Sequence, residues 1–345
     1  MSAEPIADPR PAFLAERSPT VAILVPCLNE AAAIAKVVGD FRSSLPQARI
    51  FVYDNGSTDD TVNLARAAGA VLRAEPLRGK GNVVRRMFAD VEADVFVLVD
   101  GDDTYDAAAA PDLIDRLLRE SLDMVNAARR TSAAAAYRTG HRSGNWLLST
   151  LVATLFGNRL TDLLSGYRVF SRRFVKSFPA LAAGFEIETE LSVHALQMRM
   201  PLAEVVTAYR ERPPGSASKL NTYKDGLRIL RTVMQLVKEE RPLAFFSVIS
   251  ALLAVISVLL GVPVIIEFMH TGLVPRLPTA LLAASIAILS FLGFACGLIL
   301  DTVSRGRMEA KRFAYLAVPA LRFSPAARDE NGFGTSDRTA PSPRA

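Results

Sequence analysis

The sequence predicts an α/β fold, in which helices flank a mainly parallel sheet, followed by a hairpin of two transmembrane helices. The first observation behind this prediction is that short apolar runs alternate with Ala-, Leu- and Arg-rich stretches of helical spacing. The second is a surplus of apolar sequence, because 50% of the 345 residues are hydrophobic and the mean hydropathy is +0.23. A soluble enzyme needs less apolar sequence than this.

The apolar runs that predict strands are residues 21–25, 50–53, 70–73, 95–99 and 122–127. The first four runs are continuous rather than alternating, which is typical of strands that are covered on both faces in a parallel sheet. Ligands of such sheets bind at the carboxyl ends of the strands. The residues that follow each strand are therefore the first candidates for a functional site.

Three of these strand ends lead into polar, acidic segments: residues 26–30 (PCLNE), 54–61 (DNGSTDDT) and 100–105 (DGDDTY). The last segment crowds Asp100, Asp102 and Asp103 together. At about 4 Å and an effective dielectric constant near 20, each carboxylate gains roughly 4 kcal/mol per unit of cation charge. Oxygen ligands favour Mg²⁺ or Mn²⁺, whose shell is completed by water and substrate phosphates. The sequence thus predicts a divalent cation site, and a solvated acidic loop is the alternative.

Two further segments keep two interpretations each. Residues 54–61 either belong to the same ligand site or form a glycine turn before a helix capped by Ser57 or Thr58. Residues 78–86 (RGKGNVVRR) either bind a phosphate or form a helix C-cap and a solvated helix face, and they lack the P-loop pattern.

The apolar surplus lies in residues 243–266 and 277–300, which contain no charged side chain. As helices they would each reach about 36 Å, enough to cross a hydrocarbon core of roughly 30 Å, and buried core helices are the alternative. Basic residues flank the pair: Lys238, Arg241, Arg305, Arg307, Lys311 and Arg312. Basic flanks stay in the cytoplasm. We therefore expect a multi-pass protein of the inner (cytoplasmic) membrane, with its catalytic domain and both termini in the cytoplasm.

The expected organisation is a disordered tail (1–18), a catalytic domain (19–218), a juxtamembrane helix (219–242), the hairpin (243–300) and a basic segment with a disordered tail (301–345). Residues 1–18 lack the apolar core that is typical of a signal peptide. Cys27 and Cys296 would lie in a cytoplasmic strand end and in a span, so we expect reduced thiols. The net charge of +5 comes without a nucleic-acid-binding signature, and basic residues beside the spans suit anionic membrane lipids.

In their order along the chain, the segments VPCLNE, YDNGSTDDT, GKGN and DGD resemble the motifs of inverting family 2 glycosyltransferases with the GT-A (Rossmann-like) fold. The expected spans narrow the resemblance to dolichol-phosphate mannose synthases and bacterial polyprenyl-phosphate glycosyltransferases. It covers residues 21–312. The resemblance implies that a sugar passes from a UDP- or GDP-sugar to a membrane polyprenyl phosphate on the cytoplasmic face.

For the donor, the resemblance implies a nucleotide site that consists of Pro26, Asn29, Glu30, Asp54, Lys80 and Asp100. Asp102 would bind Mg²⁺ or Mn²⁺ directly, and Asp100 would support the metal or the ribose. Some relatives carry a Gln where Thr104 stands, so Asp103 is a candidate for the third metal ligand.

Residues 162–173 (DLLSGYRVFSRR) resemble a later family motif, which places Asp162 on the sugar or acceptor side. The residues expected near the acceptor phosphate are Arg129, Arg130, Ser165 and Arg168. Residues 145–160 are apolar, and they either lie at the membrane interface or form an ordinary core helix.

Residues 212–220 (RPPGSASKL) resemble the family's mobile loop, in which Arg212 and Lys219 fold over the diphosphate. A plain linker to the juxtamembrane helix is the alternative. Glu186 and Glu188 either contact sugar hydroxyls or lie at a capped helix end.

The expected reaction needs no strong general base, because the acceptor phosphate oxygen is already anionic. The leaving diphosphate needs opposite charge instead, which a metal at Asp102 would supply together with Arg212 and Lys219. The alternatives are another lipid or glycan acceptor, a processive polysaccharide synthase and an inactive membrane scaffold. The synthase is disfavoured because its QxxRW signature is absent, and the scaffold because it has no need for clustered acids opposite basic residues. A homo-oligomer is left open.

Overall fold

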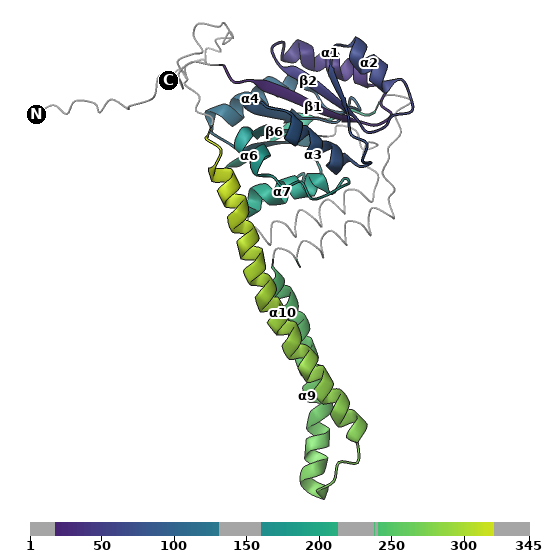
Figure 1. Ribbon diagram of the computed structural model, residues 1–345, viewed down its shortest axis with the longest axis vertical. Helices are drawn as coiled ribbons and strands as arrows, with labels where there is room; N and C mark the ends of the chain where they lie inside the picture. The colour runs from purple at the N-terminus through teal and green to yellow at the C-terminus, as the bar shows by residue number, and fades with distance from the viewer. Residues whose placement is uncertain (1–17, 131–159, 213–237, 239–240, 321–345) are drawn as a thin grey trace, which may run out of the picture.

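The computed structural model describes residues 18–130, 160–212, 238 and 241–320, which form an α/β domain and two long helices that extend from it (Figure 1). The seven strands are β1 (Val21–Cys27), β2 (Arg49–Asp54), β3 (Val71–Ala74), β4 (Val95–Leu98), β5 (Met124–Arg130), β6 (Arg168–Ser171) and β7 (Leu202–Ala208). They form one sheet in the order β3-β2-β1-β4-β6-β5-β7. Only β6 is antiparallel to its neighbours, so the predicted mainly parallel α/β fold is confirmed.

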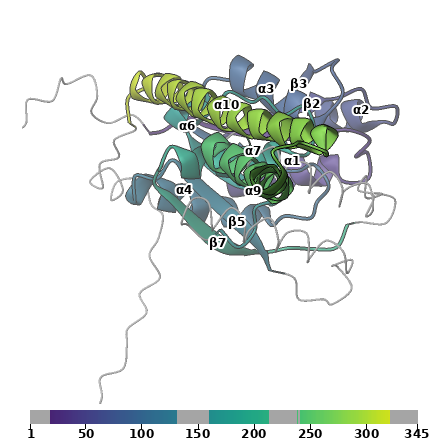
Figure 2. The same cartoon turned by 90° about the horizontal axis from the view of Figure 1, so that it is seen from below.

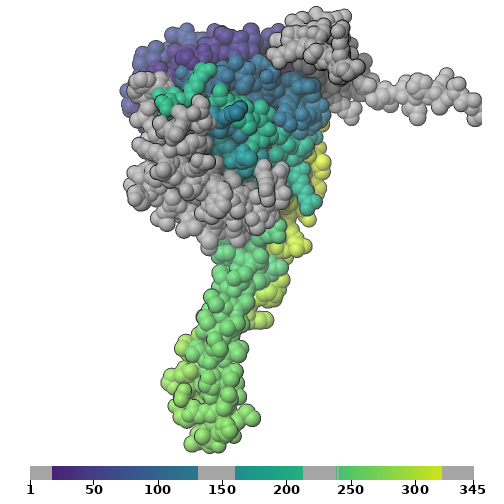
Figure 3. All heavy atoms as spheres, turned by 180° about the vertical axis from the view of Figure 1, so that it is seen from behind, coloured from purple at the N-terminus to yellow at the C-terminus, as the bar shows by residue number. Residues whose placement is uncertain are grey.

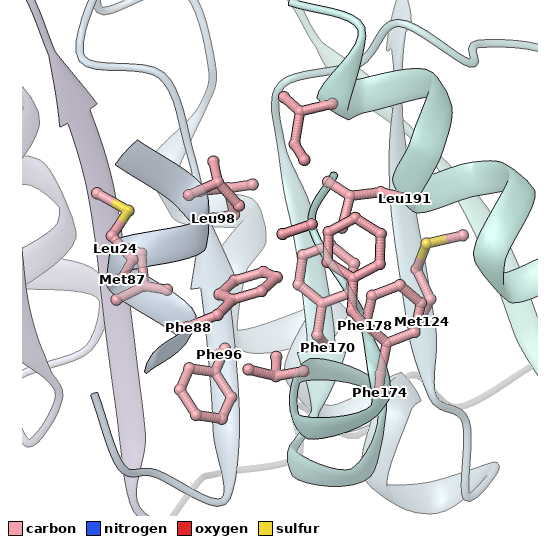
Figure 4. Packing of buried hydrophobic residues seen from close by; sticks show 14 of the residues in the cluster. Leu24, Met87, Phe88, Phe96, Leu98, Met124, Phe170, Phe174, Phe178 and Leu191 are labelled. Atoms are coloured by element: carbon pink, nitrogen blue, oxygen red, sulfur yellow. The ribbon is translucent and has the colours of Figure 1, made fainter. Parts of the chain in front are cut away.

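Helices cover both faces of this sheet. They are α1 (Ile34–Ser44), α2 (Thr61–Ala67), α3 (Lys80–Asp90), α4 (Ala110–Arg119), α6 (Arg172–Ser177) and α7 (Ile187–Gln197), with a short 3₁₀ turn η2 (Ala107–Ala109) before α4. Strand β4 shows why its apolar run is continuous, because Phe96 and Leu98 enter one core cluster while Val95 and Val97 enter the other. Figure 4 shows the first cluster, where Phe88 of α3 packs between strand and helix side chains. The full burial of one large apolar side chain contributes about 1.5–3 kcal/mol to the stability of the folded state.

The two long helices are α9 (Pro242–Thr271) and α10 (Leu277–Leu316). Both are candidate membrane spans by length and composition, with hydropathies of 2.8 and 2.3. They lie side by side below the α/β domain (Figure 3). The predicted apolar hairpin is therefore present as two helices, which continue beyond the predicted ends of the spans.

Small residues line the contact between these helices at a spacing of seven. Apart from Pro242 at the start of α9, the buried positions are Ser250, Ser257 and Val264 on α9 and Ala283, Ser290 and Gly297 on α10. A seven-residue repeat keeps one seam facing the partner helix. Two serines also donate across the seam, from Ser257 to the carbonyl of Ala283 at 2.8 Å and from Ser290 to the carbonyl of Ser250 at 2.7 Å.

The C-terminal end of α10 returns to the α/β domain and packs against α6, and in Figures 1 and 2 both lie on the same side of the domain. The basic residues that follow the second predicted span lie in α10, which continues to Leu316. Lys311 donates to the side-chain oxygen of Gln197 on α7 at 2.8 Å. Most of the predicted N-terminal tail, juxtamembrane helix and C-terminal tail lies outside the described residues, as do residues 145–159 of the predicted interfacial segment.

Candidate active site

The three acidic strand ends meet at one edge of the sheet. Cys27, the last residue of β1, pairs with Asp54, the last residue of β2, and β1 also pairs with β4. The amide of Asn55 donates to the carbonyl of Cys27 at 2.9 Å, which holds the loop after β2 against β1. Gly101, in the loop after β4, packs closely on Cys27, because a Cβ added at Gly101 would lie 2.6 Å from the Cys27 sulfur. The predicted convergence of these loops is therefore present.

The loops after β1 and β2 are locked together by side-chain hydrogen bonds. The Asp54 carboxylate accepts from the amide of Ser57 at 3.0 Å and from the amide of Gly56 at 3.0 Å. Asn29 adopts a left-handed conformation with φ of 52°, and its side-chain oxygen accepts from the amide of Thr58 at 2.8 Å. Ser57 and Thr58 thus bind predicted site residues. The alternative that they cap α2 is wrong, because the N-cap of α2 is Asp60, whose side chain makes no capping hydrogen bond.

Two other predicted nucleotide residues lie beside this loop pair. The amide of Glu30 donates to the hydroxyl of Thr61 at 2.8 Å, and Glu30 is 8% exposed. Pro26 lies within β1 and pairs with Tyr53 of β2. A proline within a strand offers no amide hydrogen to the ladder. These residues, which were predicted to contact a nucleotide, therefore lie together at the ends of β1 and β2 and in the loop after β1.

Lys80 connects the acidic edge to a helix far along the chain. Its ammonium group donates to Asp100 at 2.5 Å and to Glu188 of α7, 108 residues away, at 2.6 Å. Burial alone lowers the pKa of Lys80, but the charges of Asp100 and Glu188 outweigh burial and raise it. Burial likewise raises the pKa of Glu188, although Lys80 opposes the shift. Gly79 and Gly81 let the start of α3 lie against the carbonyl groups of residues 182–183, because a Cβ at either glycine would overlap one of these carbonyl oxygens.

Asp102 is a buried carboxylate with two different partners. One oxygen accepts from the hydroxyl of Thr104 at 2.6 Å, and the other lies 2.7 Å from the guanidinium of Arg212. Burial and the nearby charge of Asp100 raise the pKa of Asp102, while Thr104 and Arg212 oppose the rise. Thr104 therefore supports the Asp102 carboxylate.

The carboxylates at this edge are candidates for a metal whose coordination shell a substrate would complete. Within the described ranges, no group of three or more His, Cys, Asp or Glu side chains is arranged to hold a metal. Mg²⁺ commonly uses only one or two protein carboxylates together with substrate phosphates. Asp100 and Asp102 could supply these. Burial and the charge of Asp100 raise the pKa of Asp102, and a cation would offset this repulsion. Asp103 instead has a left-handed φ of 58° and binds Lys36 of α1 at 2.7 Å.

On the other side of the edge, Asp162 and Arg129 form a bidentate ion pair. Both donor–acceptor distances, from the Arg129 Nε and Nη2 atoms to the two Asp162 oxygens, are 2.7 Å. Burial raises the pKa of Asp162, but the guanidinium of Arg129 outweighs burial and lowers it. The guanidinium carbon of Arg129 also lies 5.5 Å from the ring centre of Tyr209. Two residues predicted for different roles therefore act as one unit.

The structure disagrees with a phosphate contact for Arg168 and Ser165. Arg168 is fully buried (0% exposed), and its guanidinium donates to the carbonyls of Leu163 at 2.7 Å and Ser165 at 3.1 Å. Ser165 is also fully buried, and its hydroxyl donates to the carbonyl of Ala127 at 2.6 Å. Both side chains hold the chain before β6 in place. Neither is exposed to an acceptor in this structure, because backbone carbonyls between β5 and β6 take up their donors.

Of the remaining predicted residues, Arg130 ends β5 with an exposed side chain, and Lys219 lies outside the described part of the chain. The sequence did not predict the role of the aromatic residues. The hydroxyl of Tyr105 accepts from the amide of Gly166 at 2.7 Å, and its ring lies 5.3 Å from that of Tyr209. Tyr105 was visible in the DGDDTY segment, but no pattern in the sequence pairs it with Gly166.

The segment after β7 joins both halves of the site. The amide of Tyr209 donates to the carbonyl of Arg130 at 3.2 Å, and the amide of Arg210 donates to the carbonyl of Thr104 at 2.8 Å. These two bonds bring Arg212 to Asp102.

A mainly parallel seven-stranded sheet, flanked by helices and carrying acidic loops at the carboxyl ends of its strands, is the architecture of a GT-A domain. Residues 22–178 match the family described as Glycosyl transferase family 2. The chain is also 35% identical over 229 residues to glycosyltransferase AglJ of Haloferax volcanii, which covers 66% of this chain and 75% of that protein. The chain therefore belongs to glycosyl transferase family 2.

Two further similarities bear on ligands. Dolichyl-phosphate hexose transferase of Haloferax volcanii is 29% identical over 223 residues, which are 64% of this chain and 95% of that protein. Glucosyl-3-phosphoglycerate synthase from Mycobacterium tuberculosis, solved in complex with Mn²⁺, UDP and phosphoglyceric acid, has a TM-score of 0.51 and 26% identity. That similarity covers 64% of this chain and 78% of the solved chain.

Proposed function

We propose that this glycosyltransferase moves a sugar from a UDP- or GDP-sugar to a membrane polyprenyl phosphate on the cytoplasmic face, with inversion at the anomeric carbon. The observation that carries the proposal is the pair of candidate spans whose second helix packs against the α/β domain that bears the site. An acceptor with an isoprenoid tail stays in the bilayer, so an enzyme that uses it gains from a membrane anchor. The similarity to a dolichyl-phosphate hexose transferase supports the same acceptor class.

The donor is assigned to the edge formed by the ends of β1, β2 and β4. Asp54 and Asn29 shape the loops that would enclose the nucleoside, and Lys80 places Asp100 beside Asp102. Mg²⁺ or Mn²⁺ bound at these two aspartates would neutralise charge on the leaving diphosphate. The solved relative with Mn²⁺ and UDP supports a divalent cation.

The acceptor is assigned to Arg129 and the exposed Arg130 at the end of β5. Asp162 fixes the Arg129 guanidinium through two hydrogen bonds, and Tyr209 packs against it. A carboxylate whose pKa is lowered is a weak base, so we place Asp162 as a residue that positions Arg129. The acceptor phosphate needs no proton acceptor, because its attacking oxygen is already anionic. Arg212 supplies fixed positive charge on the diphosphate side.

The test is a transfer assay on the full chain in detergent. It combines polyprenyl phosphate, Mn²⁺ or Mg²⁺ and a panel of radiolabelled UDP- and GDP-sugars, and the label is counted in the organic phase. We expect label in the organic phase with one donor and none when polyprenyl phosphate is omitted. Label that appears only in the aqueous phase, with 3-phosphoglycerate as acceptor, would overturn the lipid acceptor. That result would favour the acceptor chemistry of the solved relative.

A further inference from the structure

We infer that Glu204 of β7 and Asn126 of β5 are positioning residues of the acceptor site. They hold the backbone at Asp162, whose carboxylate in turn fixes the guanidinium of Arg129. The inference deepens the proposed function, on which it rests for the role of Arg129 and for the identity of the acceptor. Both residues act through Asp162, because their hydrogen bonds go to the backbone of the loop that carries it.

The Glu204 carboxylate accepts hydrogen bonds from two successive backbone amides of this loop. The amide of Thr161 donates to it at 3.1 Å, and the amide of Asp162 donates to it at 3.3 Å. The hydroxyl of Thr161 donates to the same carboxylate. Hydrogen bonds to an ionised acceptor are stronger than those to a neutral one. Glu204 therefore fixes the backbone at Asp162 from the side of β7.

Asn126 holds the same loop from the side of β5. It is the register partner of Glu204 in the parallel pair of β5 and β7, and it is fully buried (0% exposed). Its side-chain amide donates to the carbonyl of Asp162 at 2.8 Å and to the Glu204 carboxylate at 2.9 Å. Its side-chain oxygen has no hydrogen-bond partner within the described residues. The side chain thus directs both of its donors to the loop and its carboxylate neighbour, although a buried oxygen without a partner costs stability.

The position of this backbone decides where the Asp162 carboxylate lies. Asp162 is 5% exposed, and each of its two oxygens accepts from the Arg129 side chain at 2.7 Å. The backbone amide of Arg129 also donates to this carboxylate, at 3.2 Å. The planar geometry of a bidentate pair leaves little room for misalignment. A shift of the loop therefore moves the guanidinium that is assigned to the acceptor phosphate.

Position and charge predict opposite effects when Glu204 is removed. The loss of one negative charge from this part of the site would by itself favour an anionic acceptor, because it removes a repulsion. The loss of the hydrogen bonds to the loop would instead displace Arg129 and weaken the binding of the acceptor. A rise in the KM for the acceptor therefore reports position, and a fall reports charge.

The test measures steady-state kinetics of the full chain in detergent, with polyprenyl phosphate as acceptor. For Glu204→Ala we expect the KM for polyprenyl phosphate to rise by roughly 10-fold or more, with much smaller changes in kcat and in the KM for the donor. Glu204→Gln removes the same charge but keeps one acceptor oxygen, so its KM should lie between those of the wild type and Glu204→Ala. In an Asp162→Asn background, Glu204→Ala should add little, because both changes act on Arg129 through one carboxylate.

Two further variants complete this experiment. Asn126→Leu keeps the approximate size of the side chain and loses both donors, so it should raise the KM for polyprenyl phosphate in the same direction as Glu204→Ala. Glu92→Ala is the matched control, since it removes a carboxylate that is 61% exposed and lies before the amino end of β4. This control should behave like the wild type.

Hydrogen exchange provides a second measurement, which does not depend on the acceptor. The amides of Thr161 and Asp162 should exchange roughly 10-fold or more faster in Glu204→Ala than in the wild type, because they lose their acceptor. A KM for polyprenyl phosphate that is unchanged or lower in Glu204→Ala and Glu204→Gln, or equal exchange in Glu204→Ala and the wild type, would overturn the positioning role. If the wild type moved no label to polyprenyl phosphate while exchange changed as expected, the proposed acceptor would be wrong and the hold of Glu204 on Asp162 would stand.

Discussion

The hydroxyl of Tyr315, near the end of α10, donates a hydrogen bond of 2.8 Å to the carboxylate of Asp123, 192 residues earlier in the chain. Asp123 is fully buried (0% exposed), and it also accepts from Ser171 at 2.6 Å and from Arg173 at 2.5 Å. The guanidinium of Arg173 lies 4.8 Å from the ring centre of Tyr315. The second candidate span is therefore tied into the α/β domain by a buried polar cluster.

Tyr315→Phe should destabilise the α/β domain by about 1–3 kcal/mol, because it leaves a buried carboxylate with one hydrogen bond fewer. The measurement is thermal or denaturant unfolding of the full chain in detergent. Arg305→Gln on the same helix is the control, since Arg305 is 77% exposed and its pair with Asp301 should contribute at most about 0.5 kcal/mol. Equal stability of Tyr315→Phe and the wild type would show that the helix end does not support the domain.

Gly166→Ala should weaken donor binding while the chain stays folded. A Cβ at Gly166 would overlap the carboxylate of Asp100, so Asp100 must move away from Lys80. We expect roughly a 10-fold or greater loss of affinity for a nucleotide with Mn²⁺, which corresponds to about 1.4 kcal/mol. Calorimetric titration with UDP and GDP measures this loss. Gly39→Ala is the control, because a Cβ at Gly39 meets nothing within 4 Å.

Asp102→Asn should reduce turnover by roughly 100- to 1,000-fold, which is typical for the loss of one electrostatic contact to a transition state. The asparagine keeps the size of the side chain and its bond to Thr104, so the fold should persist. The measurement is the transfer assay together with a circular dichroism spectrum. Turnover near the parent rate would remove the metal role of this residue.

Asp162→Asn and Arg129→Gln should each raise the KM for polyprenyl phosphate by roughly 10- to 100-fold, with a much smaller change in the KM for the donor. The double variant should be little worse than the poorer single variant, because the two residues act as one unit. Steady-state kinetics measures both effects. If Asp162→Asn instead removed the low-pH limb from the pH dependence of kcat, Asp162 would be a general base after all.

His194 should make the domain less stable in mild acid. Burial, with a further contribution from the charge of Lys311, lowers the pKa of His194 to about 3. In the unfolded chain a histidine takes up its proton near pH 6.5, so stability is complete above this pH and falls as pH decreases toward 3, by up to about 1.4 kcal/mol per pH unit. His194→Gln should flatten this dependence in denaturant unfolding measured from pH 7 to pH 4. An identical slope for the variant and the wild type would contradict the prediction.

Local sequence patterns were sufficient to predict the sheet covered by helices on both faces and the two long apolar helices. Continuous apolar runs such as residues 95–98 predict a sheet covered on both faces, because each second side chain must enter a different core cluster. The uncharged segments likewise predict two long apolar helices. The position of Asp54 and Asp102 at one edge follows from a general property of parallel sheets, whose strands all end on the same side.

Contacts between distant parts of the chain could not be predicted in this way. Lys80–Glu188 joins two helices, and Tyr315–Asp123 joins a helix to the loop before β5. Each pair spans more than one hundred residues, and no periodicity encodes such a pairing. Arg168 shows the same limit, since its family motif suggested a phosphate contact while the packing between β5 and β6 buries its guanidinium among carbonyls. The chemical type of each side chain is a local property, whereas its partner and its burial depend on how helices and strands pack in three dimensions.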